Sequence, residues 1–130
     1  GQAWQQAHEG LKARPVLEKA AALSDKGTIW ARLARVYFDV GDDQKAIRAS
    51  RNAIRKGGIK RKDLTYVVLG NAHLNLHCYD DAIDAFAEAA KDKRSSVYAK
   101  RLIDYAKREG VRRQKLRDMG AAIPGCANRA

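Results

Sequence analysis

The amino-acid sequence predicts an all-α domain, because its composition favours helices and a helical pattern occurs twice along it. The 130 residues include many alanines but only two prolines, which favours helices over sheets or disorder. With 45% hydrophobic residues the chain can bury one core. No apolar run approaches the ~18 residues that a membrane span needs, so we expect no membrane insertion.

Two segments of the chain match each other at a constant offset. Trp30 and Ala46 have counterparts in Tyr66 and Ala82, each 36 positions further along. Such internal periodicity is typical of repeat proteins. The matched pairs are Trp30/Tyr66, Leu33/Leu69, Ala34/Gly70, Tyr37/His73, Ala46/Ala82, Ile47/Ile83 and Ala53/Ala89.

The first copy predicts two helices joined by a tight turn. Trp30, Leu33 and Tyr37 recur on one helical face. Gly41 suits the left-handed position after a helix, and Asp42 or Asp43 suits the N-cap of the next helix. The second helix is expected over residues 43–56, before the glycines at 57 and 58.

The second copy predicts the same plan, with helices over residues 63–76 and 80–92 and a turn at residues 77–80. Before the two copies, residues 10–23 are expected to form a helix with Pro15 in its first turn. After them, Ser95 or Ser96 is expected to cap a long helix that reaches Met119. The last residues are expected to be irregular.

At this point the chain resembles the tetratricopeptide repeat family. The matching positions are Trp30, Leu33, Ala34, Tyr37, Gly41, Ala46 and Ala53 in one copy, and Tyr66, Leu69, Gly70, Ala82, Phe86 and Ala89 in the other. The copies depart from the pattern at Ser50, His73 and His77. The resemblance implies a solenoid, a right-handed superhelix of antiparallel helix pairs. Its parts would be a partial repeat (1–26), two repeats (27–60 and 61–94), a capping helix with a basic extension (95–119) and a tail (120–130).

The resemblance also implies a non-catalytic scaffold that binds a peptide or helix of a partner protein in its concave groove. Asn71 and Asn75 could bond a peptide backbone, while Arg35 and Lys107 could hold acidic side chains. A lysine/asparagine clamp for a chaperone C-terminus is not reproduced. The expected groove residues are Arg35, Phe38, Val67, Asn71, Leu74, Asn75, Lys100, Ile103 and Lys107, with Ala31 and Asp39 beside them.

No residue pattern predicts catalysis or a cofactor, so we expect no enzyme. His73 and His77, four residues apart and beside Cys78, have the spacing of metal ligands. A buried packing role for His73 and a turn role for His77 explain them without a metal, and no fourth ligand is evident. Cys78 and Cys126 could pair in an oxidising compartment or remain two free thiols.

Lysine and arginine outnumber aspartate and glutamate by 26 to 15, which leaves a net charge of +11. The excess is concentrated in residues 44–62 and 91–117. This charge favours acidic partners, and a nucleic-acid-associated module is the alternative function. We expect a protein partner rather than nucleic acid. The aromatic residues of these segments are predicted to fill core positions and so are not free to stack on bases, and solvent-exposed helix faces explain the charge.

A narrower resemblance concerns residues 56–61, 69–72 and 89–95. They are similar to the C-terminal part of a repeat protein found with TonB-type energy-transduction systems of Gram-negative bacteria. The resemblance implies a periplasmic accessory of an uptake system, with the cytoplasm as the alternative compartment. Self-association through the open N-terminal end is a further expectation.

Overall fold

The computed structural model describes residues 14–20 and 27–127, and this part of the chain is helical without a β-strand. Residues 14–20 are helical. The later helices are α2 (Gly27–Asp39), α3 (Asp43–Lys56), α4 (Lys62–Asn75), α5 (Tyr79–Ala89) and α6 (Lys93–Asp118). The predicted all-α class is therefore confirmed. None of the described helices has the length and apolarity that crossing a membrane requires.

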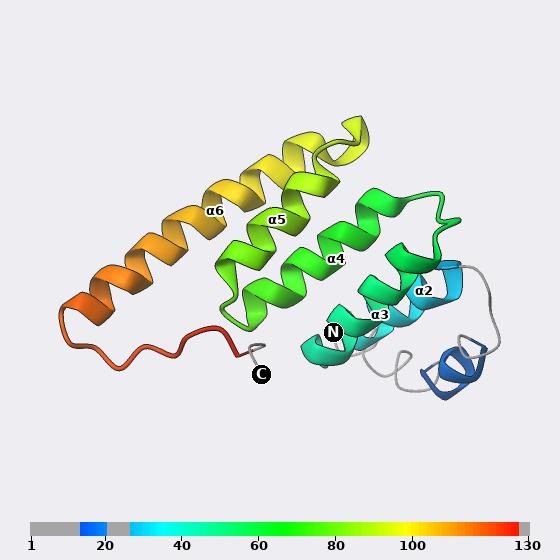
Figure 1. The fold of residues 1–130 in the computed structure, drawn as a ribbon, viewed down its shortest axis with the longest axis horizontal. Helices are drawn as coiled ribbons and strands as arrows, with labels where there is room; N and C mark the ends of the chain where they lie inside the picture. Colours follow the sequence, from blue (N-terminus) through cyan, green and yellow to red (C-terminus); the bar gives the residue numbers. More distant parts are fainter. Residues whose placement is uncertain (1–13, 21–26, 128–130) are drawn as a thin grey trace, which may run out of the picture.

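Each helix from α2 to α6 packs against the next helix in chain order. In addition, α4 contacts both α2 and α6. Figure 1 shows α4, α5 and α6 side by side, with α6 extending well past the end of α5. The short turns between the helices allow this arrangement, because helices joined by few residues pack as neighbours.

The turn after α2 forms as the sequence predicts. Gly41 has a φ of 86°, which is the left-handed region that glycine enters without strain. Asp42 is the N-cap of α3, and its carboxylate accepts a hydrogen bond from the Lys45 amide at 3.1 Å. At α6 the prediction is wrong: Asp92, and not Ser95 or Ser96, is the N-cap, and its side chain accepts from the Arg94 amide at 2.9 Å.

The buried core consists of two clusters. One lies mainly between α2, α3 and α4 and includes Leu33, Tyr37 and Ile47. The other lies between α5 and α6 and includes Phe86, which is fully buried. The large side chain Tyr66 of α4 packs against both clusters. One continuous apolar interior therefore joins the helices.

The helix over residues 14–20 packs against α2. Leu17 contacts the first cluster, and the Tyr37 hydroxyl donates a hydrogen bond to Glu18 at 2.7 Å. Burial and this bond raise the pKa of Tyr37 to about 12. The expected helix over residues 10–23 is thus helical at 14–20, and its remaining residues lie outside the described part of the chain.

The tail after α6 returns to the turn between α4 and α5. Cys126 forms a disulfide with Cys78, which settles the alternative left open by the sequence. The Ala127 amide donates to the Leu76 carbonyl at 2.9 Å. The Arg117 guanidinium donates to the Pro124 carbonyl at 2.9 Å. Residues 121–126 form no helix or strand, as expected, but the disulfide and these hydrogen bonds hold them against the helices.

Candidate functional site

A groove of about 600 Å³ lies between the N-terminal halves of α2 and α4. The loop before α4 supplies part of its lining. The lining residues are Thr28, Ala31, Arg32, Arg35, Gly58, Ile59, Lys60, Arg61, Leu64, Thr65 and Val68.

The groove has an apolar floor and a cationic rim. Val68 is buried and Leu64 is 47% exposed, so both present aliphatic surface to the groove. Arg32, Arg35 and Lys60 are exposed along its edge. None of the described residues that line it is acidic. Such a surface favours a ligand that carries both an apolar group and a carboxylate.

Two of the cations at this edge are held in place by acidic partners. Arg35 donates from Nε to Asp39 at 3.1 Å. Arg61 donates from Nη2 to Asp63 at 2.8 Å. Because Arg61 is paired in this way, its pKa is raised above the ordinary value. Their guanidinium groups are therefore oriented before any ligand binds.

Asp63 also joins the first turn of α4 to the first turn of α6. Its carboxylate accepts a hydrogen bond from the Ser95 hydroxyl at 2.5 Å and lies 3.9 Å from an Arg94 nitrogen. The hydrogen bond from Arg61 lowers the pKa of Asp63 well below the usual range, against the opposing effect of burial. The buried carboxylate is therefore charged and hydrogen-bonded, and it links the groove-lining end of α4 to the start of α6.

The structure places the predicted groove residues in three different environments. Arg35 lines the groove between α2 and α4. Phe38 packs against the first core cluster. The remaining apolar members pack against the second cluster, so they contribute to the interior between α4, α5 and α6; they are Val67, Leu74 and Ile103.

The polar members of the prediction are also dispersed. The Asn75 amide donates to Asp43 of α3 at 3.0 Å, and Asn71 is half-buried and does not line the groove. Lys100 is exposed on α6, and Lys107 lines a different cavity. The Asn75 amide is thus already bonded within the chain, and the expected contact of Asn71 and Asn75 with a peptide backbone stays a prediction.

Sequence reasoning missed most of the groove. Arg32, Lys60 and Leu64 line it but were not predicted. A signal existed for Leu64, because it lies four residues before Val68 on the same helical face. No local signal existed for Lys60, because only packing of the loop brings it beside α2.

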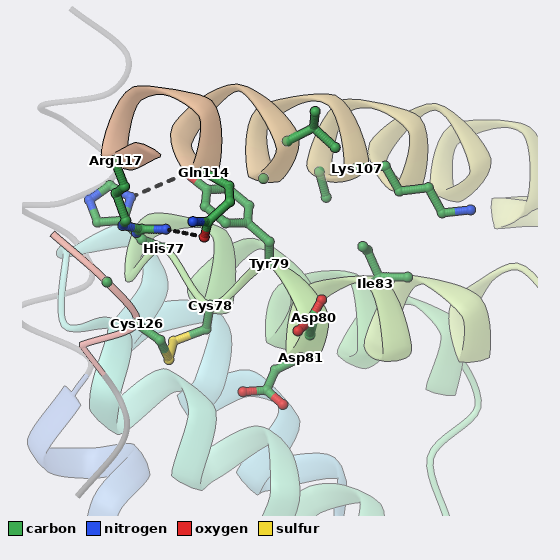
Figure 2. Close-up of a pocket in the computed structure, with 14 residues that line it drawn as sticks. His77, Cys78, Tyr79, Asp80, Asp81, Ile83, Lys107, Gln114, Arg117 and Cys126 are labelled. Carbon is green, nitrogen blue, oxygen red and sulfur yellow. Dashed lines mark hydrogen bonds between the residues drawn. A yellow bond between two sulfur atoms is a disulfide. The ribbon is translucent and has the colours of Figure 1, made fainter. Parts of the chain in front are cut away.

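A second cavity, of about 740 Å³, lies between the start of α5, the second half of α6 and the tail. Figure 2 shows the Cys78–Cys126 disulfide at its edge, with Arg117 and Gln114 of α6 above. Lys107 also lines this cavity.

Beside this cavity lies a cluster of polar side chains. His73, Cys78 and Asp81 each offer a ligand atom within 4.8 Å of the others. His77, which sequence spacing paired with His73, is not part of the cluster, and its Nδ1 instead lies 3.4 Å from the Tyr79 hydroxyl. His73 is buried, as its place in the repeat predicts.

The aromatic residues of α6 correct one expectation. The sequence suggested that the aromatic residues of the basic segments fill core positions. Instead Tyr98 is 53% exposed and Tyr105 is 49% exposed. They share one face of α6 with Arg101, Arg108 and Arg112, which are also exposed.

Comparisons of the chain with protein-family models, with curated proteins and with solved structures each gave no match.

Proposed function

We propose that this chain is a tetratricopeptide-type scaffold without catalytic activity, built as a right-handed solenoid with α6 as its capping helix. The turn geometry supports two equivalent helix pairs. Gly41 and His77, 36 residues apart, both have positive φ. Asp42 and Cys78, also 36 residues apart, each immediately precede the second helix of their pair.

The groove between α2 and α4 binds an acidic, extended segment of a partner protein in this proposal. The observation that carries it is an apolar floor beside four cations, two of which, Arg35 and Arg61, pair with carboxylates outside the lining. An aliphatic side chain of the segment would contact Leu64 and Val68. Carboxylates on either side of it would pair with Arg32 and Arg35.

The test is a selection of peptides from a random display library on the immobilised protein. Enriched peptides should combine Asp or Glu with a central Leu, Ile or Phe. Their affinity, measured by fluorescence anisotropy, should fall at least about tenfold with Arg32→Glu/Arg35→Glu, since charge-assisted hydrogen bonds contribute ~1.5–3 kcal/mol each. This loss would follow from reversed charge at the rim.

The matched control is Arg48→Glu/Arg55→Glu on α3, which changes the net charge equally but lies outside the groove. It should leave the affinity within about twofold, the difference expected of long-range electrostatics in physiological salt. Equal losses in the two variants, or selected peptides without acidic residues, would contradict groove binding.

A basic module that binds single-stranded nucleic acid is the second candidate, and the exposed face of α6 favours it. Tyr98 and Tyr105 could stack on bases, while the arginines between and after them contact phosphates. Affinity for a labelled single-stranded oligonucleotide should then fall linearly with the logarithm of salt concentration. Tyr98→Ala/Tyr105→Ala should weaken it, and Val97→Ala/Val111→Ala on a neighbouring exposed face should not.

A periplasmic location, as an accessory of a TonB-type uptake system, is also proposed. The disulfide supports it, because disulfides persist in oxidising compartments. Trapping thiols during cell fractionation tests the location: the periplasmic fraction should contain the chain in its oxidised form.

Self-association through the N-terminal end is also proposed. Light scattering tests it, and a monomer at high concentration would argue against it.

A further inference from the structure

Three potential metal ligands converge where α4 ends and α5 begins. His73 lies in the last turn of α4, Cys78 is the N-cap of α5, and Asp81 lies in the first turn of α5. Their ligand atoms all lie within 4.8 Å of one another. The Cys126 sulfur is bonded to the Cys78 sulfur, although in the oxidised form it lies outside this group of three. Two sulfurs, one imidazole and one carboxylate are together a complete donor set for tetrahedral Zn²⁺.

His73 supplies an independent sign that the cluster is incomplete. The residue is only 2% exposed, and its Nδ1 has no hydrogen-bond partner in the described part of the chain. A buried polar atom without a partner is costly, so such an atom is expected to have a ligand in some state of the protein.

We propose that reduction of the Cys78–Cys126 disulfide creates a Zn²⁺ site formed by His73, Cys78, Asp81 and Cys126. The oxidised form does not bind the ion in this way, since both sulfurs are then shared in the S–S bond. The Cys78–Cys126 bond thus holds the tail covalently in the oxidised form, and an ion bound by all four residues holds it in the reduced form.

The reducing step is a thiol–disulfide exchange with a dithiol. Cys78 is buried and Cys126 is half-buried, so the incoming thiolate attacks the Cys126 sulfur. The electron pair of the S–S bond leaves on Cys78, at the N-terminus of α5, where the helix dipole stabilises a thiolate. The second thiol of the dithiol then releases Cys126 as a thiol, and the dithiol becomes a disulfide. Zn²⁺ binding displaces the thiol protons to solvent.

A cavity beside the disulfide gives both the dithiol and the Zn²⁺ ion access to the site. Cys78, Asp81 and Cys126 line the cavity of about 740 Å³ described above. Figure 2 shows the disulfide and the Asp81 side chain at the edge of this open space. Arg51 of α3 is a positive charge close enough to lower the pKa of His73. It offsets part of the charge of two thiolates and one carboxylate.

The experiment titrates Co²⁺, a spectroscopic substitute for Zn²⁺, into the whole chain after reduction with a phosphine. Intense visible d–d bands, which are typical of tetrahedral cobalt, and a thiolate-to-cobalt charge-transfer band should appear at one equivalent. Zn²⁺ should abolish both by displacement. The oxidised chain should show neither band at the same concentrations. Reduced protein without these bands would overturn the proposal.

Asp81→Asn is compared with Asp80→Asn, which changes the same charge one residue away but lies outside the cluster. Asp81→Asn should weaken Zn²⁺ binding at least about tenfold, because removing even an outer-shell partner costs 10–100-fold. Asp80→Asn should bind as the parent does. Equal affinities for the two variants would remove Asp81 from the site.

Cys126→Ser tests the sulfur ligands without touching the core. It should remain helical by circular dichroism, while the charge-transfer band loses about half its intensity because one thiolate remains. An unchanged band would show that Cys126 is not a ligand. A His73→Gln variant, checked for folding in the same way, should lose affinity by at least about tenfold.

Discussion

His77 occupies a backbone position that normally belongs to glycine. Its φ is 62°, and the Cys78 amide after it donates to the His73 carbonyl at 2.8 Å, which closes the end of α4. A side chain in this left-handed region costs roughly 1–2 kcal/mol. The sequence shows this position through the repeat, because Gly41 occupies it in the first copy.

We expect His77→Gly to stabilise the fold by about 1 kcal/mol, since it removes this strain. Among the described residues the His77 side chain makes a long polar contact and a tilted ring contact, both with Tyr79, so little is lost. Urea unfolding followed by circular dichroism measures the change. The converse control is Gly41→Ala. A β-carbon at this position would meet no other atom, so backbone strain alone should lower the free energy of unfolding by about 1 kcal/mol. A destabilised His77→Gly would contradict this account.

Gly70 permits the close approach of α4 and α5. A β-carbon at this position would overlap the ring of Phe86, which is fully buried and has no room to move. Gly70→Ala should therefore lower the free energy of unfolding by about 1–3 kcal/mol, the usual cost of overpacking.

Gly110→Ala is the matched control, because it adds the same methyl group to a helix interior. There the new atom would meet Tyr79 at 3.6 Å, an ordinary contact. This variant should gain up to about 1 kcal/mol from helix propensity. The two variants shifting the urea midpoint in the same direction would refute the explanation by packing.

At the scale of elements, the first turns of α4 and α6 are joined by Asp63. Its side chain is 1% exposed and accepts hydrogen bonds from Arg61 and Ser95. This link is not visible in the sequence, because the two partners lie 32 residues apart and neither belongs to a local motif. The sequence predicted Ser95 or Ser96 as the N-cap of this helix, a role that Asp92 performs.

Asp63→Asn should cost about 2 kcal/mol at neutral pH, the usual contribution of hydrogen bonds to a charged group. The pKa of Asp63 is lowered in the folded state, so its contribution is complete above the unfolded value of 3.8 and is lost as pH falls below it. The difference in unfolding free energy between the parent and the variant should therefore shrink between pH 5 and about pH 3. A difference independent of pH would contradict the role of the charge.

At the scale of the whole molecule, the tail after α6 connects distant parts of the chain. The disulfide spans 48 positions of sequence and ties the end of the chain to the turn before α5. In Figure 1 the tail runs back from the end of α6 toward α4. The disulfide thus closes a covalent ring of residues 78–126, and α6 lies within this ring.

Removing the disulfide with Cys78→Ala/Cys126→Ala should lower stability by about 3 kcal/mol, because the unfolded chain regains the entropy of an open loop. Urea unfolding in the presence of a chelator measures this change without interference from metals. Limited proteolysis should also cleave the tail near residue 121 much faster in the variant. An unchanged stability would mean that the hydrogen bonds of Arg113 and Arg117 to Pro124 hold the tail by themselves.

The sequence by itself determined the helices and most of their ends, because apolar spacing, glycine and Asp42 act within a few residues of one another. It also determined that Leu33, Phe86 and a set of small residues are buried, namely Ala34, Ala46, Gly70 and Ala82. Only the tertiary structure decided which exposed side chains meet. Lys60 lines the same groove as Arg32, and Cys126 reaches Cys78, because of the angles between packed helices and the path of the tail. Those angles depend on the sum of many contacts across the core, which no local spacing encodes.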